Sequence, residues 1–214
     1  MQQVLCFGDS NTWGYDPANR GERYSPQLRW TGLLQMLLAQ SSGHQWKVVE
    51  EGLNGRTTVF GAELEPHRVG LTYIAPCVLS HKPLSAIILM LGTNDTKIHY
   101  HATGRTIALG MERLLREIHW ACASESRVPP ILLIAPKPLN PDIMNPEFDR
   151  QSAEKSSQLA AFYRQIAVKY GCDFLDAGAF MPFPSLDGIH LSAQEHRILG
   201  QAVADWVCKL PPRP

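Results

Sequence analysis

The sequence lacks an excess of charge of either sign. Among its 214 residues, 20 lysines and arginines are balanced by 20 aspartates and glutamates. A net charge of zero provides no long-range field that would attract nucleic acid or an anionic membrane. The sequence also has no apolar run near the roughly 20 residues that a membrane-spanning helix needs, and no basic leader with a cleavage site. We therefore expect a cytoplasmic protein with small neutral partners, and neither nucleic acid nor a membrane among them.

Cysteine is scarce, and the motifs of common cofactors are missing. The five cysteines are scattered and never have the spacing of a metal knuckle or a redox pair: Cys6, Cys77, Cys122, Cys172 and Cys208. His99 and His101 lie two residues apart, but no cysteine or carboxylate cluster accompanies them. The sequence has no phosphate-binding loop of the G-x-x-x-x-G-K type and no dinucleotide fingerprint. We expect thiols in a reducing compartment, no metal and no cofactor.

What the sequence does contain is an alternation of short apolar runs with segments of helical periodicity. The expected strands cover residues 4–7, 47–51, 86–91, 131–135 and 174–176, and the expected helices cover residues 30–39, 105–123, 151–170 and 192–208. Most of these runs are almost continuously apolar, which is typical of parallel strands covered on both faces. Ser192 and Glu195 have the spacing of a capping box at the start of the last helix.

This order of elements predicts an α/β fold with one domain over residues 1–210 and a frayed tail at 211–214. We expect a three-layer sandwich around a five-stranded parallel sheet in the flavodoxin-like strand order. Longer proline-rich connections over residues 15–28, 57–76 and 136–149 are expected at the rim of the sheet, where ligands bind in such folds.

Residues that carry hydrolytic chemistry follow the ends of the expected strands. Ser10 follows the first strand, and Asp187 and His190 lie beyond the fifth. A serine becomes a nucleophile when a histidine takes its proton and a carboxylate orients that histidine. Because the carboxyl ends of parallel strands meet at one edge of a sheet, the sequence predicts a catalytic triad of Ser10, Asp187 and His190.

An oxyanion hole is expected beside this triad. The oxyanion that forms when a serine attacks an ester needs preorganised N–H donors. The candidates are the backbone amides of Ser10 and Gly55 and the side-chain amide of Asn94. Gly55 suits this role because the absence of a Cβ lets its N–H approach a ligand closely. For Gly55 and Asn94, a simple turn remains an open alternative.

Each catalytic candidate also has an ordinary structural interpretation. Ser10 could cap a helix, Asp187 could start a turn, and His190 could be a surface histidine. Three matches in the right order favour catalysis over these interpretations. Asp9 is expected to fix the turn at Ser10 by accepting backbone amides. A hydrolase built on Asp9 and Asp95 as paired carboxylates is a weaker alternative, because it would have no use for His190.

Several blocks of the sequence resemble the SGNH (GDSL) hydrolase family, and within it the bacterial arylesterase/acyltransferase branch, sometimes called perhydrolases. The blocks are FGDSNTWG at residues 7–14, RWTG at 29–32, EEGL at 50–53, RTT at 56–58, MLGTNDTK at 90–97 and DGIH at 187–190. Asn11 stands where the usual signature has leucine. The resemblance implies that Ser10 is the nucleophile, that Gly55 and Asn94 complete the oxyanion hole, and that Asp187 and His190 complete the triad.

The resemblance also implies an activity and an assembly. Members of this branch are short-chain esterases that form an acyl-serine enzyme in an apolar, water-poor pocket and pass the acyl group to water, alcohols or peroxide. They assemble as octamers whose subunits narrow the entrance. We expect Trp13, Ile98 and the rim loops to supply the substrate-binding pocket here.

The expected function is therefore that of a serine esterase, a carboxylic ester hydrolase acting on short-chain acetyl-type or aryl esters. A carbohydrate acetylesterase or a lysophospholipase/thioesterase with the same triad is the alternative among enzymes. A ligand-binding module that retains the fold without turnover is the alternative outside enzymes, and the complete triad argues against it. The expected partners are a small ester, a water or alcohol acceptor, and further copies of the chain.

Overall fold

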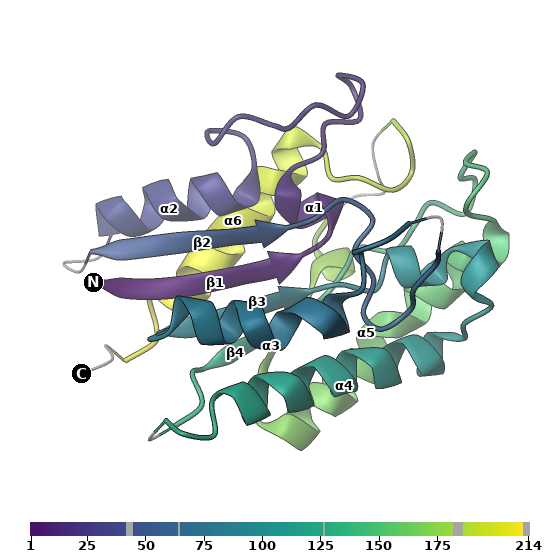
Figure 1. Cartoon of the computed structure of the whole chain (residues 1–214). Helices are drawn as coiled ribbons and strands as arrows, with labels where there is room; N and C mark the ends of the chain where they lie inside the picture. Colours follow the sequence, from purple (N-terminus) through teal and green to yellow (C-terminus); the bar gives the residue numbers. More distant parts are fainter. Residues whose placement is uncertain (42–44, 64, 126, 182–185, 212–214) are drawn as a thin grey trace.

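The computed structural model describes residues 1–41, 45–63, 65–125, 127–181 and 186–211 (Figure 1). Its strands are β1 (Gln2–Gly8), β2 (Trp46–Gly52), β3 (Ala86–Met90), β4 (Ile131–Ala135) and β5 (Asp173–Asp176). All of them pair in parallel in one sheet with the order β2-β1-β3-β4-β5. This is the predicted flavodoxin-like order, so the expected single-domain α/β fold is confirmed.

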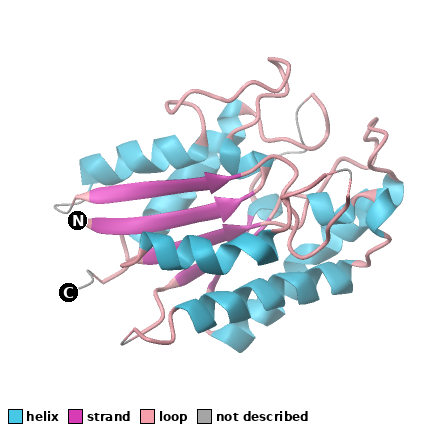
Figure 2. Cartoon of the chain, in the orientation of Figure 1, coloured by secondary structure: helices cyan, strands magenta, loops and turns pink. Residues whose placement is uncertain are grey.

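Helices cover both faces of the sheet (Figure 1, Figure 2). The helices α2 (Trp30–Ser41) and α6 (Ala193–Val207) lie on one face, and α3 (Gly70–His81), α4 (Gly104–Ala121) and α5 (Arg150–Tyr170) lie on the other. In β1, Val4 and Cys6 belong to the apolar cluster under α2 and α6, whereas Leu5 and Phe7 belong to the opposite one. Successive side chains of a strand point to opposite faces, and both faces are buried here, which is the predicted three-layer sandwich.

The centre of the sheet explains the continuous apolar runs in the sequence. Every residue of β3 and β4 is buried, because these strands have neighbours on both sides and helices on both faces. The edge strands β2 and β5 consist mostly of half-buried residues. Ser10 and Asn94 follow β1 and β3, so they stand on the best-supported part of the sheet.

The helix ends are specified locally. Asp149 and Ser152 form a capping box at the start of α5, and Gly171 ends that helix in the left-handed conformation with φ +64°. Ser192 and Glu195 form the capping box predicted for α6. This second cap fixes the point at which α6 begins, directly after the segment that carries His190.

One helix was not expected. The sequence predicts a loop over residues 57–76, and this is wrong for residues 70–76, because α3 begins at Gly70. Pro76 lies inside α3, and a proline normally indicates the end of a helix. The helix persists because its apolar side packs on the sheet through Ile74, Cys77 and Val78. Four short turns also lie outside the predicted helices: α1 (Ser10–Trp13), η1 (Asn94–Thr96), η2 (Ile98–Tyr100) and η3 (Ala177–Ala179).

Two further predictions concern the ends of the chain and membranes. Of the predicted tail, Pro211 is exposed and residues 212–214 lie outside the described residues, so the domain boundary at residue 210 stays a prediction. In the described ranges, no helix combines the length and the apolar character needed to cross a membrane.

Candidate active site

Ser10 lies where β1 turns into the short helix α1, at the carboxyl edge of the sheet. The side chain of Asp9 caps α1 by accepting a hydrogen bond from the backbone N–H of Asn11 at 2.9 Å. This is the turn-fixing role that the sequence predicts for Asp9. Gly8 leaves no room for a side chain, because a Cβ there would overlap the hydroxyl of Thr12. The tight turn thus fixes Ser10 at the start of the helix.

The three residues of the predicted triad form a continuous chain of hydrogen bonds. His190 Nε2 lies 2.9 Å from Ser10 Oγ, and His190 Nδ1 lies 2.6 Å from Asp187 Oδ2. The other carboxylate oxygen of Asp187 accepts the backbone N–H groups of Ile189 at 3.0 Å and of His190 at 2.9 Å. Gly188 turns the loop with φ +73°, in the region that favours glycine. One short loop therefore orients both the carboxylate and the imidazole.

The charge of Asp187 is stabilised by its surroundings. Burial opposes the ionisation of Asp187 and would raise its pKa. The pKa is nevertheless lowered to about 2, because His190 contributes a hydrogen bond and a favourable charge and two backbone N–H groups also donate to the carboxylate. A carboxylate in this position keeps the proton on Nδ1 of His190, so that Nε2 can accept the proton of Ser10. The neighbouring Cys6 is different, because burial raises the pKa of its thiol and keeps it inert.

Two contacts beside the triad could not be predicted from the sequence motifs. The ring of Tyr15 stacks on the imidazole of His190, with centroids 3.9 Å apart and an angle of 22° between the planes. The side-chain oxygen of Asn11 accepts the backbone N–H of Leu191 at 2.9 Å and so joins α1 to the segment after His190. The only sequence signal for either residue is its position close to Ser10.

Gly55 and Asn94 border the same cavity as Ser10. Gly55 has φ +78°, and a Cβ there would overlap the guanidinium of Arg68. Asn94 donates one side-chain N–H to the carbonyl of Arg56 at 3.1 Å. A side-chain amide has two such hydrogens, so a second donor remains for the cavity. The arrangement suits the predicted oxyanion hole, and its use in catalysis stays a prediction.

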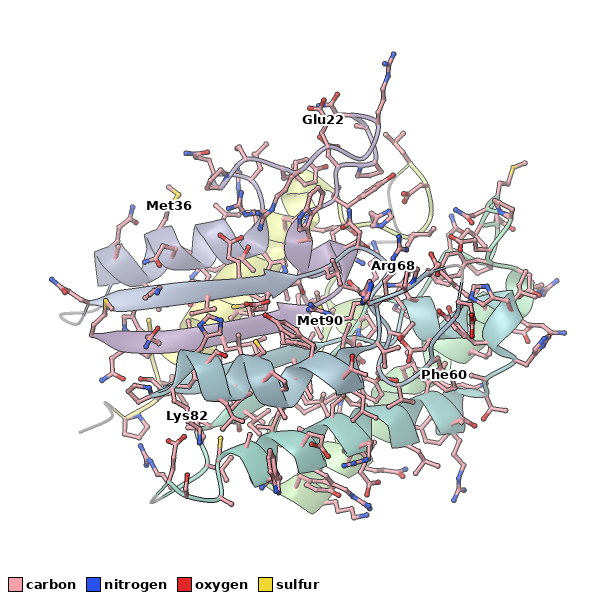
Figure 3. The ribbon with its side chains drawn as sticks, viewed as in Figure 1. Glu22, Met36, Phe60, Arg68, Lys82 and Met90 are labelled. Atoms are coloured by element: carbon pink, nitrogen blue, oxygen red, sulfur yellow. The ribbon has the colours of Figure 1, made fainter. Side chains whose placement is uncertain are left out.

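The cavity beside Ser10 has a volume of about 200 Å³. All three predicted rim connections contribute to its wall, through Tyr15, Arg68 and Phe148. Arg68 lies among the loops beyond the carboxyl ends of the strands (Figure 3). Further polar groups come from the side chains of Asn54, Asn145, Lys97 and Glu147. The wall is therefore more polar than the apolar pocket that the family resemblance implies.

Trp13 and Ile98, which the sequence predicts to bind substrate, are not among the residues that line this cavity. The ring of Trp13 instead faces the guanidinium of Arg23, which lies 5.4 Å from the ring centroid. Ile98 is partly exposed and borders a separate cavity next to the starts of α4 and α5. Neither residue borders the cavity beside Ser10, and their role in binding stays a prediction.

Two carboxylates are buried near the nucleophile. In the described part of the chain, Asp9 and Asp95 each have one side-chain oxygen without a hydrogen-bond partner. Asp95 accepts the backbone N–H of Thr58 at 2.9 Å and also its hydroxyl, so it ties η1 to a neighbouring loop. Burial raises the pKa of Asp9 to about 6 and that of Asp95 to about 7. Neither lines the cavity, which argues against the paired-carboxylate alternative.

A serine in contact with an oriented histidine, beside a cavity bordered by Gly55 and Asn94 at the carboxyl edge of a doubly wound sheet, is the arrangement of a serine-type carboxylic ester hydrolase. Known proteins agree with this class. The model of the GDSL-like Lipase/Acylhydrolase family matches residues 6–198, and the chain belongs to this family. A comparison with curated protein sequences gave no match.

Solved structures of esterases resemble the whole chain. The native aryl esterase of M. smegmatis is 36% identical with a TM-score of 0.89, over 99% of this chain and 100% of that one. Est24, a carbohydrate acetylesterase from Sinorhizobium meliloti, is 36% identical with a TM-score of 0.88 over the same shares. A structure described as a putative arylesterase from Agrobacterium tumefaciens str. C58 is 35% identical with a TM-score of 0.86, again over 99% and 100%. The chain is thus similar to both arylesterases and acetylesterases.

Proposed function

We propose that this chain hydrolyses esters of short acyl groups through an acyl-enzyme formed on Ser10. The observation that carries the proposal is the hydrogen-bond chain from Ser10 Oγ through His190 to the Asp187 carboxylate, with links of 2.9 Å and 2.6 Å. These distances are within the range that proton transfer requires of a general base. The binding-module alternative has no use for such an alignment.

In the first half of the reaction, Ser10 Oγ attacks the carbonyl carbon of the ester while its proton passes to His190 Nε2. The negatively charged Asp187 stabilises the imidazolium that results. The N–H donors of Ser10, Gly55 and Asn94 hold the developing oxyanion. When the carbon–oxygen bond of the ester breaks, His190 returns the proton to the leaving alcohol, and the acyl group stays on Ser10.

In the second half, a water molecule takes the place of the alcohol. His190 Nε2 removes a proton from the water as it attacks the acyl-serine, and then returns the proton to Ser10 Oγ. An alcohol or peroxide in place of water would give a new ester or a peracid by the same steps. The ratio of hydrolysis to acyl transfer depends on which acceptor, water or an alcohol or peroxide, reaches the acyl-serine in the cavity.

The size of the cavity supports a small acyl group. A volume of about 200 Å³ lies below the roughly 300–1,000 Å³ that is usual for drug-sized ligands. An acetyl group fits such a space, whereas a long fatty acyl chain, as in the lysophospholipase/thioesterase alternative, would have to extend beyond it. Arylesterases and acetylesterases among the similar structures agree with this preference.

The central test uses a Ser10→Ala variant with a p-nitrophenyl ester series and a fluorophosphonate probe. Wild type should be labelled covalently and should turn over p-nitrophenyl acetate faster than longer esters. The variant should lose the label and nearly all turnover while its thermal unfolding stays close to that of wild type. Labelling that survives in the folded variant would remove Ser10 from the mechanism.

A second candidate, deacetylation of carbohydrates, is favoured by the polar wall of the cavity. Asn54, Asn145 and the partly exposed guanidinium of Arg68 offer hydrogen bonds that sugar hydroxyls can use. We expect Arg68→Gln to lower kcat/KM for acetylated sugars more than for p-nitrophenyl acetate. Equal losses for both substrates would count against a sugar as the natural alcohol.

Two expectations accompany this proposal. Assembly into a homo-oligomer, and the octamer in particular, stays a prediction that the mass in solution checks. Location in the cytoplasm also stays a prediction. Product ratios from one acyl donor with and without added alcohol measure the acyltransferase activity.

A further inference from the structure

One face of α3 carries three side chains that can bind a metal. Tyr73, Cys77 and His81 follow one another at intervals of four residues, which places them in line on the same side of a helix. They face the edge strand β2, where Glu51 occupies the position next to the last. His81 Nε2 lies 3.1 Å from Glu51 Oε1, and the hydroxyl of Tyr73 lies 3.4 Å from the same oxygen.

The ligand atoms of three of these residues converge. The Glu51 carboxylate, the Cys77 thiol and the His81 imidazole each offer one atom, and these atoms lie within 4.8 Å of one another. Cys77 is buried, whereas Glu51 and His81 are half-buried. A metal ion could therefore enter the cluster from solvent on the side of Glu51 and His81, while the protein core shields the side of Cys77. Arg56 donates to the backbone carbonyl of Glu51, not to its carboxylate, and therefore leaves the carboxylate oxygens to the cluster.

From this convergence we propose that Glu51, Cys77 and His81 form a binding site for a divalent metal ion of the zinc type. Thiolate, imidazole and carboxylate are the three ligand types that zinc combines in proteins. The spacing of Cys77 and His81 puts both ligands on one helix face, as in motifs that hold zinc with two histidines four residues apart. The Tyr73 hydroxyl lies beside this set of ligands, 3.4 Å from Glu51 Oε1.

Metal binding at this site displaces one proton, from Cys77, and brings two positive charges to two anionic ligands. Without a metal, burial and the charge of Glu51 raise the pKa of the Cys77 thiol to about 12, so that the thiol is protonated. On binding, the sulfur–hydrogen bond breaks, a sulfur–metal bond forms and the proton leaves to solvent. The thiolate and the carboxylate then offset the two positive charges of the ion, beside the positive charge of the nearby Arg56 guanidinium. No oxidant or reductant is needed.

Metal binding at this point would join β2 to α3, the two elements that precede and follow the loop carrying Gly55. The sequence blocks that resemble the family include Glu51 but neither Cys77 nor His81, and the cysteines considered alone show no metal spacing. The ligands become a group only when the fold brings β2 beside α3. The site does not depend on the proposed ester hydrolysis.

Titration of the purified full chain with Co²⁺ tests this proposal, because a cobalt–thiolate bond gives a charge-transfer absorption in the near ultraviolet. Wild type should develop this band and saturate at one equivalent, and Zn²⁺ should abolish it by competition. The Cys77→Ser variant should lose the band. The matched controls Cys172→Ser and Cys208→Ser should keep it, since they remove a half-buried and an exposed thiol elsewhere.

A second variant keeps the test decisive if Cys77→Ser fails to fold. His81→Gln changes a half-buried residue and should weaken Co²⁺ binding by about tenfold or more, while the exposed control His99→Gln should not. Absence of the band in wild type at one equivalent would overturn the proposal. So would a band that persists in folded Cys77→Ser, or an unchanged affinity in His81→Gln.

Discussion

The imidazole of His190 is held from three directions, by Ser10, by Asp187 and by the ring of Tyr15. The hydrogen bonds fix the positions of the two ring nitrogens, but the ring can still rotate about the line that joins them. The stacked ring of Tyr15, with centroids 3.9 Å apart, restricts that rotation. Tyr15 also lines the cavity, so it links the position of the proposed general base to the shape of that cavity.

We therefore predict that Tyr15→Leu lowers kcat while leaving the fold intact. A stacked aromatic pair contributes about 0.5–1.5 kcal/mol beyond its buried area, which corresponds to roughly a two- to tenfold loss if the stack acts mainly on the reacting geometry. Steady-state kinetics on p-nitrophenyl acetate measures this, and Tyr15→Phe is the control that keeps the ring. A Tyr15→Phe variant as slow as Tyr15→Leu would assign the effect to the hydroxyl instead.

Asn94 is the second residue whose contribution can be isolated. If its side chain donates to the oxyanion, Asn94→Ala should lower kcat by about a hundred- to a thousandfold with a smaller change in KM. The substitution also removes the hydrogen bond to the Arg56 carbonyl, so the free energy of unfolding must be measured beside the kinetics. An unchanged kcat in a folded variant would leave Asn94 with only its structural role in the turn.

A site residue could be predicted from the sequence when a local pattern, such as a motif after a strand, fixes its position. Ser10, Asp187 and His190 are each recognisable by chemistry and by their place after a strand, and the fold brings them within hydrogen-bonding distance. Trp13 and Ile98 were inferred only from their apolar character near the motifs, which does not fix where a side chain points. Arg68 and Phe148 reach the cavity through the path of long loops, and no local pattern records that path.

At the level of elements, α6 depends on a buried ion pair as well as on its capping box. The Glu195 carboxylate accepts the Ser192 backbone N–H at 2.7 Å with one oxygen and contacts Lys137 with the other. The side chains of Lys137 and Glu195 are only 5% and 2% exposed. Lys137 follows β4, so this pair ties the start of α6 to the sheet beside the triad loop.

Removing one partner of this pair should be costly. Glu195→Ala leaves the ammonium of Lys137 buried without its carboxylate, and we predict a loss of about 3–5 kcal/mol in the free energy of unfolding. Urea unfolding followed by circular dichroism measures it. The control is Glu154→Ala, whose exposed partner Arg150 lies 3.8 Å away and whose loss should cost less than about 1 kcal/mol. Similar losses in both variants would contradict a special role for the buried pair.

The elements also show why the fold could be predicted better than its details. Alternating apolar strands and amphipathic helices leave few topologies, and the observed strand order is the one expected. The helix α3 was missed because Pro76 is a local signal for a break, whereas the contacts of Ile74 and Val78 with the sheet are long-range and decide the outcome. Edge strand β5 begins one residue before its predicted start, at Asp173, because backbone pairing with β4 does not require an apolar side chain.

For the whole molecule, two buried groups make the stability depend on pH in opposite directions. His196 is buried in α6, its Nδ1 accepts the backbone N–H of Trp30 at 3.3 Å, and burial lowers its pKa to about 3. Below its unfolded pKa of about 6.5 the unfolded chain binds a proton that the native chain does not, so stability falls as the pH falls. Asp95 has a raised pKa of about 7, and between about pH 4 and pH 7 the native chain holds a proton that the unfolded chain has lost, so stability falls as the pH rises.

These opposing slopes predict how two variants differ. Between about pH 4 and pH 6.5, each group changes the free energy of unfolding by at most about 1.4 kcal/mol per pH unit. Asp9, whose raised pKa is about 6, acts in the same direction as Asp95 up to that pH, so the two acids outweigh His196 in wild type. Asp95→Asn leaves Asp9 to oppose His196, so its stability should stay nearly constant up to about pH 6, where wild type loses stability as the pH rises. His196→Gln removes the base, so its stability should fall with pH over the same window. Urea unfolding at half-unit pH steps gives the slopes, and parallel curves for the two variants would mean that neither group keeps its buried, neutral state in the native protein.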